Sequence, residues 1–421
     1  MITLQDAKSE VEQPNRKHPR SWAKGYILTP LVLLLLCISG VVVFLFMPEL
    51  PWTAQSFAVN ASVCGRWEVI ARPNLGFNVS TSSFNSIGVA SIEDIWFTGT
   101  IDNFDDSEQQ PLIVRWKGEH FRDTYIPPGD WLYSGMDGVA AVTQDDVWVI
   151  GHDYWDKLLM RWDGDHWSRV PLRSGVNPVG PYLNAVAAVT KNDVWIAGCC
   201  DASNNSSVMM HWNGKIWDII PYPTTPATST VLSDIAVIAV NDIWVVGSHD
   251  EANTLITHWN GSIWEVVPSP NLCKVKNTLV SVSAIGANDV WAVGACSDED
   301  TGGRIAWGKT LIEHWDGTRW SIVQGPGLLG PHQLTGVAAI SPDDVWAVGV
   351  SWTNANYPVV EHTVVMHWDG KQWSVIPSPN QSSAQSFYDV AAVSKDEIWA
   401  VGESENQVFS ARFIRTACPT P

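Results

Sequence analysis

Short apolar stretches alternate with turn residues along most of the chain after residue 64. The clearest stretch is the phrase Asp-Asp-Val-Trp-Ala-Val-Gly, which recurs with small changes about every 50 residues. Its copies contain Trp96, Trp148, Trp195, Trp244, Trp291, Trp346 and Trp399. A second phrase, an apolar run followed by His-Trp-Asp-Gly-x-x-Trp or a close variant, follows each of the first six copies. The pattern predicts a repeat protein built from short strands.

Each repeat predicts four strands. The first is apolar and small, as at residues 138–142, and a tight turn leads to the second strand with its Trp. The third strand ends in His-Trp, and an Asp-Gly or Asn-Gly pair then forms a hairpin, because both residues accept positive φ. Another Trp marks the fourth strand. Four strands per repeat are typical of β-propeller blades, whose crowded innermost strands favour small side chains.

The seventh repeat is incomplete. After Trp399 the chain supplies one further strand, residues 407–415, and no fourth. Residues 65–74 match the second half of the later repeats, with Gly-x-x-Trp followed by Pro-Asn. A strand from each terminus therefore completes the last blade and closes the ring without an unpaired half-blade. We expect an all-β, seven-bladed β-propeller of four-stranded blades at residues 64–418.

The repeat resembles bacterial propeller proteins of the kelch and galactose-oxidase-central-domain type. Its Asp-Gly-x-x-Trp hairpin is similar to a relaxed Asp-box. The resemblance covers residues 65–416 and implies the propeller architecture. The kelch double glycine and the strict Asp-box spacing Asp-x-Gly-x-Thr-Trp are both absent. The resemblance therefore implies little about activity.

An uncharged apolar run at residues 26–47 is long enough to cross a bilayer as a helix. Lys and Arg residues precede it and only Glu49 follows closely, so the positive-inside rule places the N-terminus in the cytoplasm and the propeller outside. A cleavable signal peptide is the alternative, but its apolar region is shorter. We expect a disordered cytoplasmic tail at 1–24, a transmembrane signal anchor at 25–47 and a stalk at 48–63, in a single-pass cell-membrane protein.

Net charge limits the classes of binding partner, and composition indicates a role for the tryptophans. The formal net charge of −19 excludes nucleic acid, whose phosphates require a basic surface, and suits cationic partners. Most of the 25 Trp residues fall on repeat-equivalent positions, so we expect them to pack between blades. The Asp that opens each of the first six second strands is expected to bond its own backbone.

Six cysteines follow the apolar run, an even number that is typical of an oxidising compartment. Cys64 and Cys418 flank the two strands that close the ring, so we expect a disulfide clasp there. Cys273 and Cys296 fall on one rim of the fifth blade and can pair. The adjacent cysteines 199–200 could form a strained vicinal disulfide or remain free thiols.

Loops of varying length share one rim of the predicted ring, because strands alternate in direction. We call this side, which carries the loops between second and third strands and between successive blades, the variable rim; the opposite rim has short, uniform turns. Binding residues often lie on such loops over a rigid scaffold. Here the variable rim carries acidic residues, one His and exposed aromatic residues that could bind sugars, cations or a basic protein, or could form only a solvated acidic surface. They are Asp102, Asp105, His152, Tyr154, Trp155, Asp156, Asp250, Asp298, Asp300 and Trp352.

Three further polar residues, Asn184, Asp234 and Asp389, are expected to edge the central channel. Residues 298–303 weakly resemble a calcium loop, but they lack its alternating ligand spacing. The His residues of the His-Trp pairs lie on different blades and cannot converge on one ion. We therefore predict no metal site and no cofactor, with calcium as a weak alternative.

The function expected from these features is a non-catalytic module that binds a glycan, peptide or protein. A scaffold for assembling a membrane complex is a variant of the same reading. The alternative is an extracytoplasmic hydrolase or oxidase of the sialidase or galactose-oxidase kind. Arg122, Arg173 and Arg304 are expected on the variable rim, but the Arg-Ile-Pro signature of sialidases is missing. No Tyr is followed by His, as a copper-radical oxidase would require.

Overall fold

The computed structural model describes residues 37–38, 41–42, 63–76, 79–103, 109–125, 127, 133–153, 157–172, 182–199, 207–223, 229–250, 252–299, 308–328, 330–353 and 360–418. The chain divides into two units, residues 1–56 and residues 57–421. In the first unit, β1 (Cys37–Ile38) pairs antiparallel with β2 (Val41–Val42). The rest of the expected anchor, the tail at 1–24 and nearly all of the stalk lie outside the described residues. No helix in the described part of the chain is both long and apolar enough to cross a membrane.

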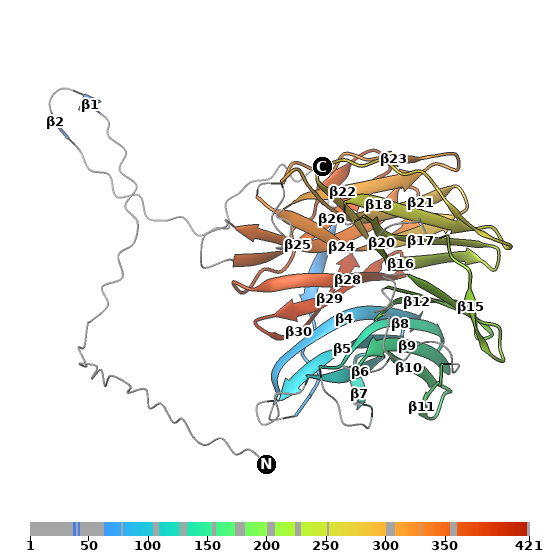
Figure 1. Ribbon diagram of the computed structural model, residues 1–421. Helices are drawn as coiled ribbons and strands as arrows, with labels where there is room; N and C mark the ends of the chain where they lie inside the picture. The colour runs from blue at the N-terminus through green and yellow to red at the C-terminus, as the bar shows by residue number, and fades with distance from the viewer. Residues whose placement is uncertain are drawn as a thin grey trace, which may run out of the picture. The chain divides into compact units, whose positions relative to one another are not determined.

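The described strands of the second unit form a seven-bladed β-propeller with four antiparallel strands in each blade (Figure 1). Blades 1 and 2 hold β4 (Val79–Ser91), β5 (Asp94–Asn103), β6 (Gln109–Lys117), β7 (His120–Tyr125), and β8 (Gly135–Thr143), β9 (Asp146–His152), β10 (Lys157–Trp162), β11 (Trp167–Arg169). Blades 3 and 4 hold β12 (Tyr182–Thr190), β13 (Asp193–Cys199), β14 (Val208–Trp212), β15 (Trp217–Ile220), and β16 (Thr230–Ala239), β17 (Asp242–His249), β18 (Asn253–Trp259), β19 (Trp264–Val266).

The remaining blades repeat this order, with one exception in the last. Blades 5 and 6 hold β20 (Lys276–Gly286), β21 (Asp289–Ser297), β22 (Lys309–Trp315), β23 (Trp320–Ile322), and β24 (His332–Ser341), β25 (Asp344–Thr353), β26 (Val360–Trp368), β27 (Trp373–Val375). Blade 7 holds β28 (Gln385–Ser394), β29 (Glu397–Ser404), β30 (Gln407–Arg415) and, as its fourth strand, β3 (Gly65–Val69) from the N-terminal side. The predicted seven blades and their four strands are therefore confirmed.

The ring closes as the sequence predicts. Strand β3 pairs antiparallel with β30, from Gly65 opposite Arg415 to Val69 opposite Ala411. A disulfide joins Cys64 and Cys418 just beyond this pairing. The first strand of each blade packs against the first strands of both neighbouring blades, and β28 of blade 7 packs against β4 of blade 1. The first and last strands of the propeller, β3 and β30, therefore belong to the same blade.

Tryptophan rings fill the junctions between blades. At the junction of blades 1 and 2, the ring of Trp96 lies 5.7 Å from that of Trp162 and 5.4 Å from that of Trp167. The same three-ring contact, between a second-strand Trp and the third- and fourth-strand Trp of the next blade, recurs at the next four junctions. This confirms the packing role predicted for these tryptophans at five junctions, because buried aromatic rings remove large apolar areas from water.

A β-bulge near the start of each first strand turns polar side chains toward the next blade. The register shifts in every inner strand, for example between Phe84 and Ser86 and between Phe387 and Asp389. At three of these bulges the extra residue donates a hydrogen bond to a backbone carbonyl of the next inner strand, over 2.6 to 3.0 Å. They are Asn85, Asn184 and Thr335. The bulges therefore link successive blades where the inner strands begin.

The Asp that opens most second strands contacts the third strand rather than its own backbone. Asp193 accepts a hydrogen bond from His211 Nε2 (2.8 Å), and the His211 ring lies 4.2 Å from that of Trp195. In blade 1 the partner is Arg115, which donates to Asp94. The expectation of a purely local turn bond is therefore wrong, because cross-strand pairing brings a cationic or imidazole donor into reach.

Candidate functional site

Asp234 and Asp389 occupy equivalent positions at the bulges of β16 and β28. One carboxylate oxygen of Asp389 accepts hydrogen bonds from Ser86 Oγ and the Ile87 backbone N–H, each over 3.0 Å. Asp234 does the same with the next blade, accepting from Ser281 Oγ at 2.9 Å and a backbone N–H at 2.8 Å. Both residues, like Asn184, lie on the innermost strand of their blade and form hydrogen bonds with the following blade. Their location at the edge of the central channel stays a prediction.

These two acids hold their protons at unusually high pH. Burial raises the pKa of Asp234 to about 7 and that of Asp389 to about 6. Hydrogen bonds from backbone N–H groups oppose the shift, and the charge of Asp389 adds to it at Asp234. The first strands of blades 4 and 7 therefore carry two interacting carboxyl groups that are partly protonated near neutral pH.

A second acidic group lies on the variable rim between blades 6 and 7. Glu361, at the start of β26, accepts hydrogen bonds from Trp352 Nε1 (3.1 Å) and Ser386 Oγ (3.0 Å). Tyr388, the bulge residue of β28, donates its hydroxyl to Glu403 over 3.2 Å. Burial and the nearby Glu361 charge raise the pKa of Glu403. Two carboxyl groups and a phenol therefore gather within one blade junction.

Across the ring, blades 2 and 3 present a His–Asp pair beside an exposed aromatic ring. His152 Nδ1 lies 2.7 Å from Asp137 Oδ2, and this hydrogen bond raises the pKa of His152. The Tyr182 ring meets the His152 ring edge to face at 5.7 Å and is 62% exposed. Tyr133 nearby in the sequence is also exposed and has a positive φ of 52°. An amphipathic ring beside a polar pair is a surface suited to peptide or sugar.

The residues predicted on the variable rim differ in their contacts and exposure. Asp102 accepts a hydrogen bond from Thr81, and Asp250 lies beside the ring of its neighbour His249 with a positive φ of 56°. Trp352 is only 8% exposed, so its predicted exposure is wrong: the indole packs inward while its N–H bonds to Glu361. The remaining rim residues lie outside the described residues: Asp105, Tyr154, Trp155, Asp156 and Asp300.

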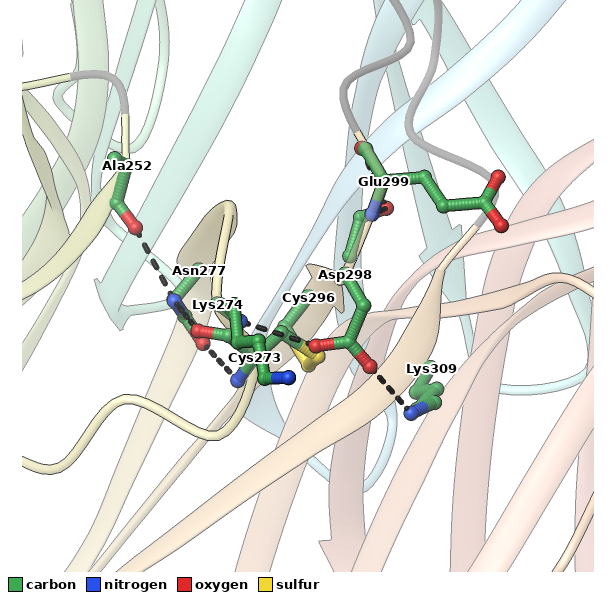
Figure 2. Close-up of a disulfide and its surroundings, with 9 residues drawn as sticks. Ala252, Cys273, Lys274, Asn277, Cys296, Asp298, Glu299 and Lys309 are labelled. Carbon is green, nitrogen blue, oxygen red and sulfur yellow. Dashed lines mark hydrogen bonds and ion pairs between the residues drawn. A yellow bond between two sulfur atoms is a disulfide. The ribbon is translucent and has the colours of Figure 1, made fainter.

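Beside the disulfide of blade 5, the Asp298 carboxylate forms hydrogen bonds with two neighbouring segments (Figure 2). Cys273 and Cys296 form a disulfide, as predicted. The Asn277 side chain accepts a hydrogen bond from the Cys273 backbone N–H and donates one to the Cys273 carbonyl. One Asp298 oxygen accepts from the Lys274 backbone N–H at 3.1 Å and the other accepts from Lys309 Nζ at 2.8 Å. The Lys309 contact lowers the pKa of Asp298.

In the described part of the chain, no three His, Cys, Asp or Glu residues lie close enough together to hold a metal ion. Residues 300–303 of the calcium-like segment lie outside that part. Cys199 ends β13, but Cys200 is not described, so the state of the vicinal pair stays open. Arg122 lies on β7, the outer strand of blade 1, rather than on a variable-rim loop as predicted. Arg173 and Arg304 fall outside the described residues.

Sequence reasoning missed Asp137, Tyr182, Glu361, Tyr388 and Glu403. Asp137 and Tyr388 sit at the same offset before the repeated second-strand Trp as Asn184, which the sequence did single out. A column-by-column comparison of the seven repeats would have exposed this bulge position. Glu361 and Glu403 carry no such signal, because their proximity comes from the packing of two blades.

No family model matches the chain, and no curated protein matches it. Solved structures match its fold. The structure of YCF48 bound to D1 peptide is 13% identical, with 84% of this chain and 99% of that one covered and a TM-score of 0.52. The BP39L lectin from Burkholderia pseudomallei is 12% identical, covering 80% and 96%, with a TM-score of 0.53. A polysaccharide lyase, an ulvan lyase, is 10% identical, covering 80% and 94%, with a TM-score of 0.50. At these identities the likeness shows a β-propeller fold, and the kelch features of the resemblance stay a prediction.

Proposed function

We propose that this chain is a non-catalytic binding module that takes a basic peptide or protein segment on its variable rim. The observation that carries the proposal is the gathering of carboxyl groups at the junction of blades 6 and 7. Glu361 and Glu403 interact electrostatically there, and Asp389 follows Tyr388 on the same inner strand. The Glu361 charge helps to raise the pKa of Glu403, so a cationic ligand would relieve the repulsion between the two carboxylates.

The rest of the molecule supports a cationic partner. The formal net charge of −19 attracts basic ligands over long range and repels acidic ones. The exposed Tyr182 offers an amphipathic surface on which a peptide can pack. A protein of the same fold has been solved with a bound peptide, which supports a peptide as the class of ligand.

The test compares three fluorescein-labelled peptides of equal length and of positive, zero and negative net charge, titrated into the full chain by fluorescence anisotropy. We expect the basic peptide to bind most tightly, and its affinity to fall as salt rises. The double substitution Glu361→Gln/Glu403→Gln should weaken this binding. The control Glu93→Gln/Asp165→Asn removes the same charge from exposed turns on the opposite rim and should leave it intact. Equal binding of all three peptides would refute the proposal.

We further propose that residues 25–47 anchor the propeller outside the cell membrane. The charge asymmetry around this run supports that orientation. The disulfides Cys64–Cys418 and Cys273–Cys296 also support it, because disulfides persist in oxidising compartments. Alkaline extraction of membranes should leave the chain in the membrane fraction, and protease added to intact cells should digest the propeller. Release of the chain by extraction would refute the anchor.

A second candidate, a glycoside hydrolase, rests on one observation. Tyr388 and Glu403 form a hydrogen-bonded tyrosine–carboxylate pair with a second carboxylic acid, Glu361, close by. Two carboxyl groups are the usual machinery of glycoside hydrolysis. The hydrogen bonds described for these three residues include none from an arginine. Turnover of methylumbelliferyl glycosides that is lost in Glu403→Gln would favour this candidate over the binding module.

A further inference from the structure

The junction between blades 7 and 1 lacks a contact between tryptophan rings that five other junctions share. At five junctions a second-strand Trp contacts the fourth-strand Trp of the next blade at 5.4 to 5.8 Å. Blade 1 has Phe121 where those blades have Trp, at the same spacing after the third-strand Trp. The smaller ring packs on Phe97 (5.4 Å) and Trp116 (5.2 Å) inside blade 1. Phe97 in turn contacts Trp399 of blade 7 at 5.7 Å, so phenylalanine rings stand where the other junctions have the fourth-strand indole.

Trp116 also adopts a different arrangement from its counterparts. In blades 2, 4, 5 and 6 the third-strand Trp donates its N–H to the turn between the first and second strands of its own blade. Trp116 instead donates to the Gly118 carbonyl of its own hairpin and is only 5% exposed. Its ring still lies 5.1 Å from Trp399 of blade 7, as the third-strand Trp rings of blades 2 to 6 lie 5.0 to 5.7 Å from the second-strand Trp of the preceding blade. Blade 1 therefore keeps the third-strand contact and differs in the partner of the indole N–H and in its fourth-strand ring.

A cleft of about 660 Å³ lies at this junction, on the outer side of the ring. Blade 7 lines it with residues 68–74, which include the closing strand's end, and with Arg412 of β30. Blade 1 contributes Trp116, Phe121 and the exposed hairpin residues Glu119 and His120. The volume lies within the range of sites that hold small molecules, about 300–1,000 Å³.

Charge inside the cleft is balanced. Glu68 accepts hydrogen bonds from Arg66 at 2.6 Å and from Arg412 at 3.0 Å, and Arg412 also reaches Glu397 at 3.5 Å. Glu68 and Arg412 are paired with each other, and the two remaining charged residues of the lining, Arg72 and Glu119, have opposite charges, so a strongly charged ligand gains little. The guanidinium and carboxylate edges are only partly covered, with 28% and 29% of the Arg412 and Glu68 side chains exposed. They can still exchange water for hydroxyl groups.

We propose that the cleft between blades 7 and 1 binds a neutral sugar of one or two rings. A sugar ring has an apolar C–H face and hydroxyl groups at its edge. The aromatic rings and the apolar residues at 69–71 and 73 offer the apolar contact, while Arg412, Glu68 and His120 offer donors and acceptors. This site differs in place and in ligand from the peptide-binding rim, and Phe121, which lines it, occupies the position where blades 2 to 6 have Trp.

The experiment measures the melting temperature of the purified, oxidised full chain with methyl glycosides of the common hexoses, 6-deoxyhexoses and N-acetylhexosamines at millimolar concentration. At least one glycoside should raise the melting temperature of the wild type, because ligand that binds only the folded state stabilises it. In Phe121→Trp, which restores the residue found in the other blades, the shift should vanish while the free protein melts no lower than the wild type. In Tyr182→Ala, which alters the rim, the shift should persist.

Two results would overturn this proposal. One is that no glycoside raises the melting temperature, and the other is that the shift survives in Phe121→Trp. Should Phe121→Trp fail to fold, Glu119→Ala/His120→Ala decides, because both side chains are exposed and line the cleft. An undiminished shift in that variant would also overturn the proposal. A shift lost in Tyr182→Ala but kept in Phe121→Trp would assign the sugar to the rim and refute the cleft.

Discussion

Glu313 places a carboxylic acid in the packed interior of blade 5. It lies on β22, opposite Ala292 of β21 and Ile322 of β23. The residue is 0% exposed, and neither carboxyl oxygen has a hydrogen-bond partner among the described residues. Blades 2, 3 and 6 have methionine at the same offset before the third-strand Trp: Met160, Met210 and Met366. Blade 4 has Thr257 there, so an acid occupies a position that most blades give to an apolar side chain.

The cost of this acid depends on pH. Burial raises the pKa of Glu313 from 4.5 to about 8, because a carboxylate loses its hydration in apolar surroundings. The folded state holds the proton more tightly than the unfolded chain, so its stability is fully present below pH 4.5 and is lost as pH rises through 8. At about 1.36 kcal/mol per pKa unit, the loss above that range reaches about 5 kcal/mol.

Chemical denaturation at pH 5 and pH 9, followed by tryptophan fluorescence, measures this effect in Glu313→Met and Glu313→Gln. Both substitutions remove the titrating group, so the wild type should lose about 4 kcal/mol more than either variant between the two pH values. Glu313→Met should also be the more stable variant, because a buried amide without a partner is costly. Glu265→Gln, at an exposed position on β19, serves as the control for a charge change.

The raised pKa values of Asp234 and Asp389 also make the wild type less stable at high pH. Both acids are present in every variant, so the difference between wild type and variant isolates Glu313. If wild type and Glu313→Met lose equal stability between pH 5 and pH 9, the Glu313 carboxyl is compensated in the folded protein and the reasoning fails.

Three further predictions test the closure and the rim. Cys64→Ser opens a loop of 354 residues and should cost on the order of 5 kcal/mol in urea unfolding, against about 3 for Cys273→Ser, whose loop has 23; equal losses would contradict the clasp. Asp389→Ala removes the acceptor for two donors of blade 1 and should cost about 1–3 kcal/mol in thermal melting; no loss would mean that water replaces the carboxylate. Asp137→Asn should lower the pKa of His152 in an NMR titration. In the wild type the pair stabilises the fold below pH 6.5, and this stability is lost as pH rises through the folded-state pKa; the variant should lack it. An unchanged pKa would contradict the pairing.

The repeat made the fold predictable. Trp96 and its counterparts recur at near-constant spacing, and each serves the same junction contact, so periodicity alone gives blade number and strand order. The closing strand could be predicted for a related reason: residues 65–69 carry half of a repeat whose other half stands at the C-terminal end. Cys64 and Cys418 then follow from the pairing, because they flank its two strands.

The rim was less predictable, since its geometry depends on contacts between blades. The ring predicted to be exposed at Trp352 is buried, and its N–H donates to Glu361; no spacing in the sequence predicts that bond. Glu403 and Glu361 belong to different blades and meet only in the folded ring. Bulge residues such as Tyr388 lie in a column that periodicity could have aligned, but the bulge itself is a property of strand pairing.

The seven blades act as internal controls for one another, and this gives a physical way to separate structure from function. Where most blades agree, as in the Trp at the second strand, one packing requirement explains the residue. Where a single blade departs at a cost, as with Glu313 in place of Met or Phe121 in place of Trp, the fold does not require the change. Restoring the common residue at such a position should leave the propeller folded, and at Glu313 more stable, while removing whatever the departure supplies. Substitutions toward the repeat therefore test function more sharply than alanine, which would disrupt packing and binding together.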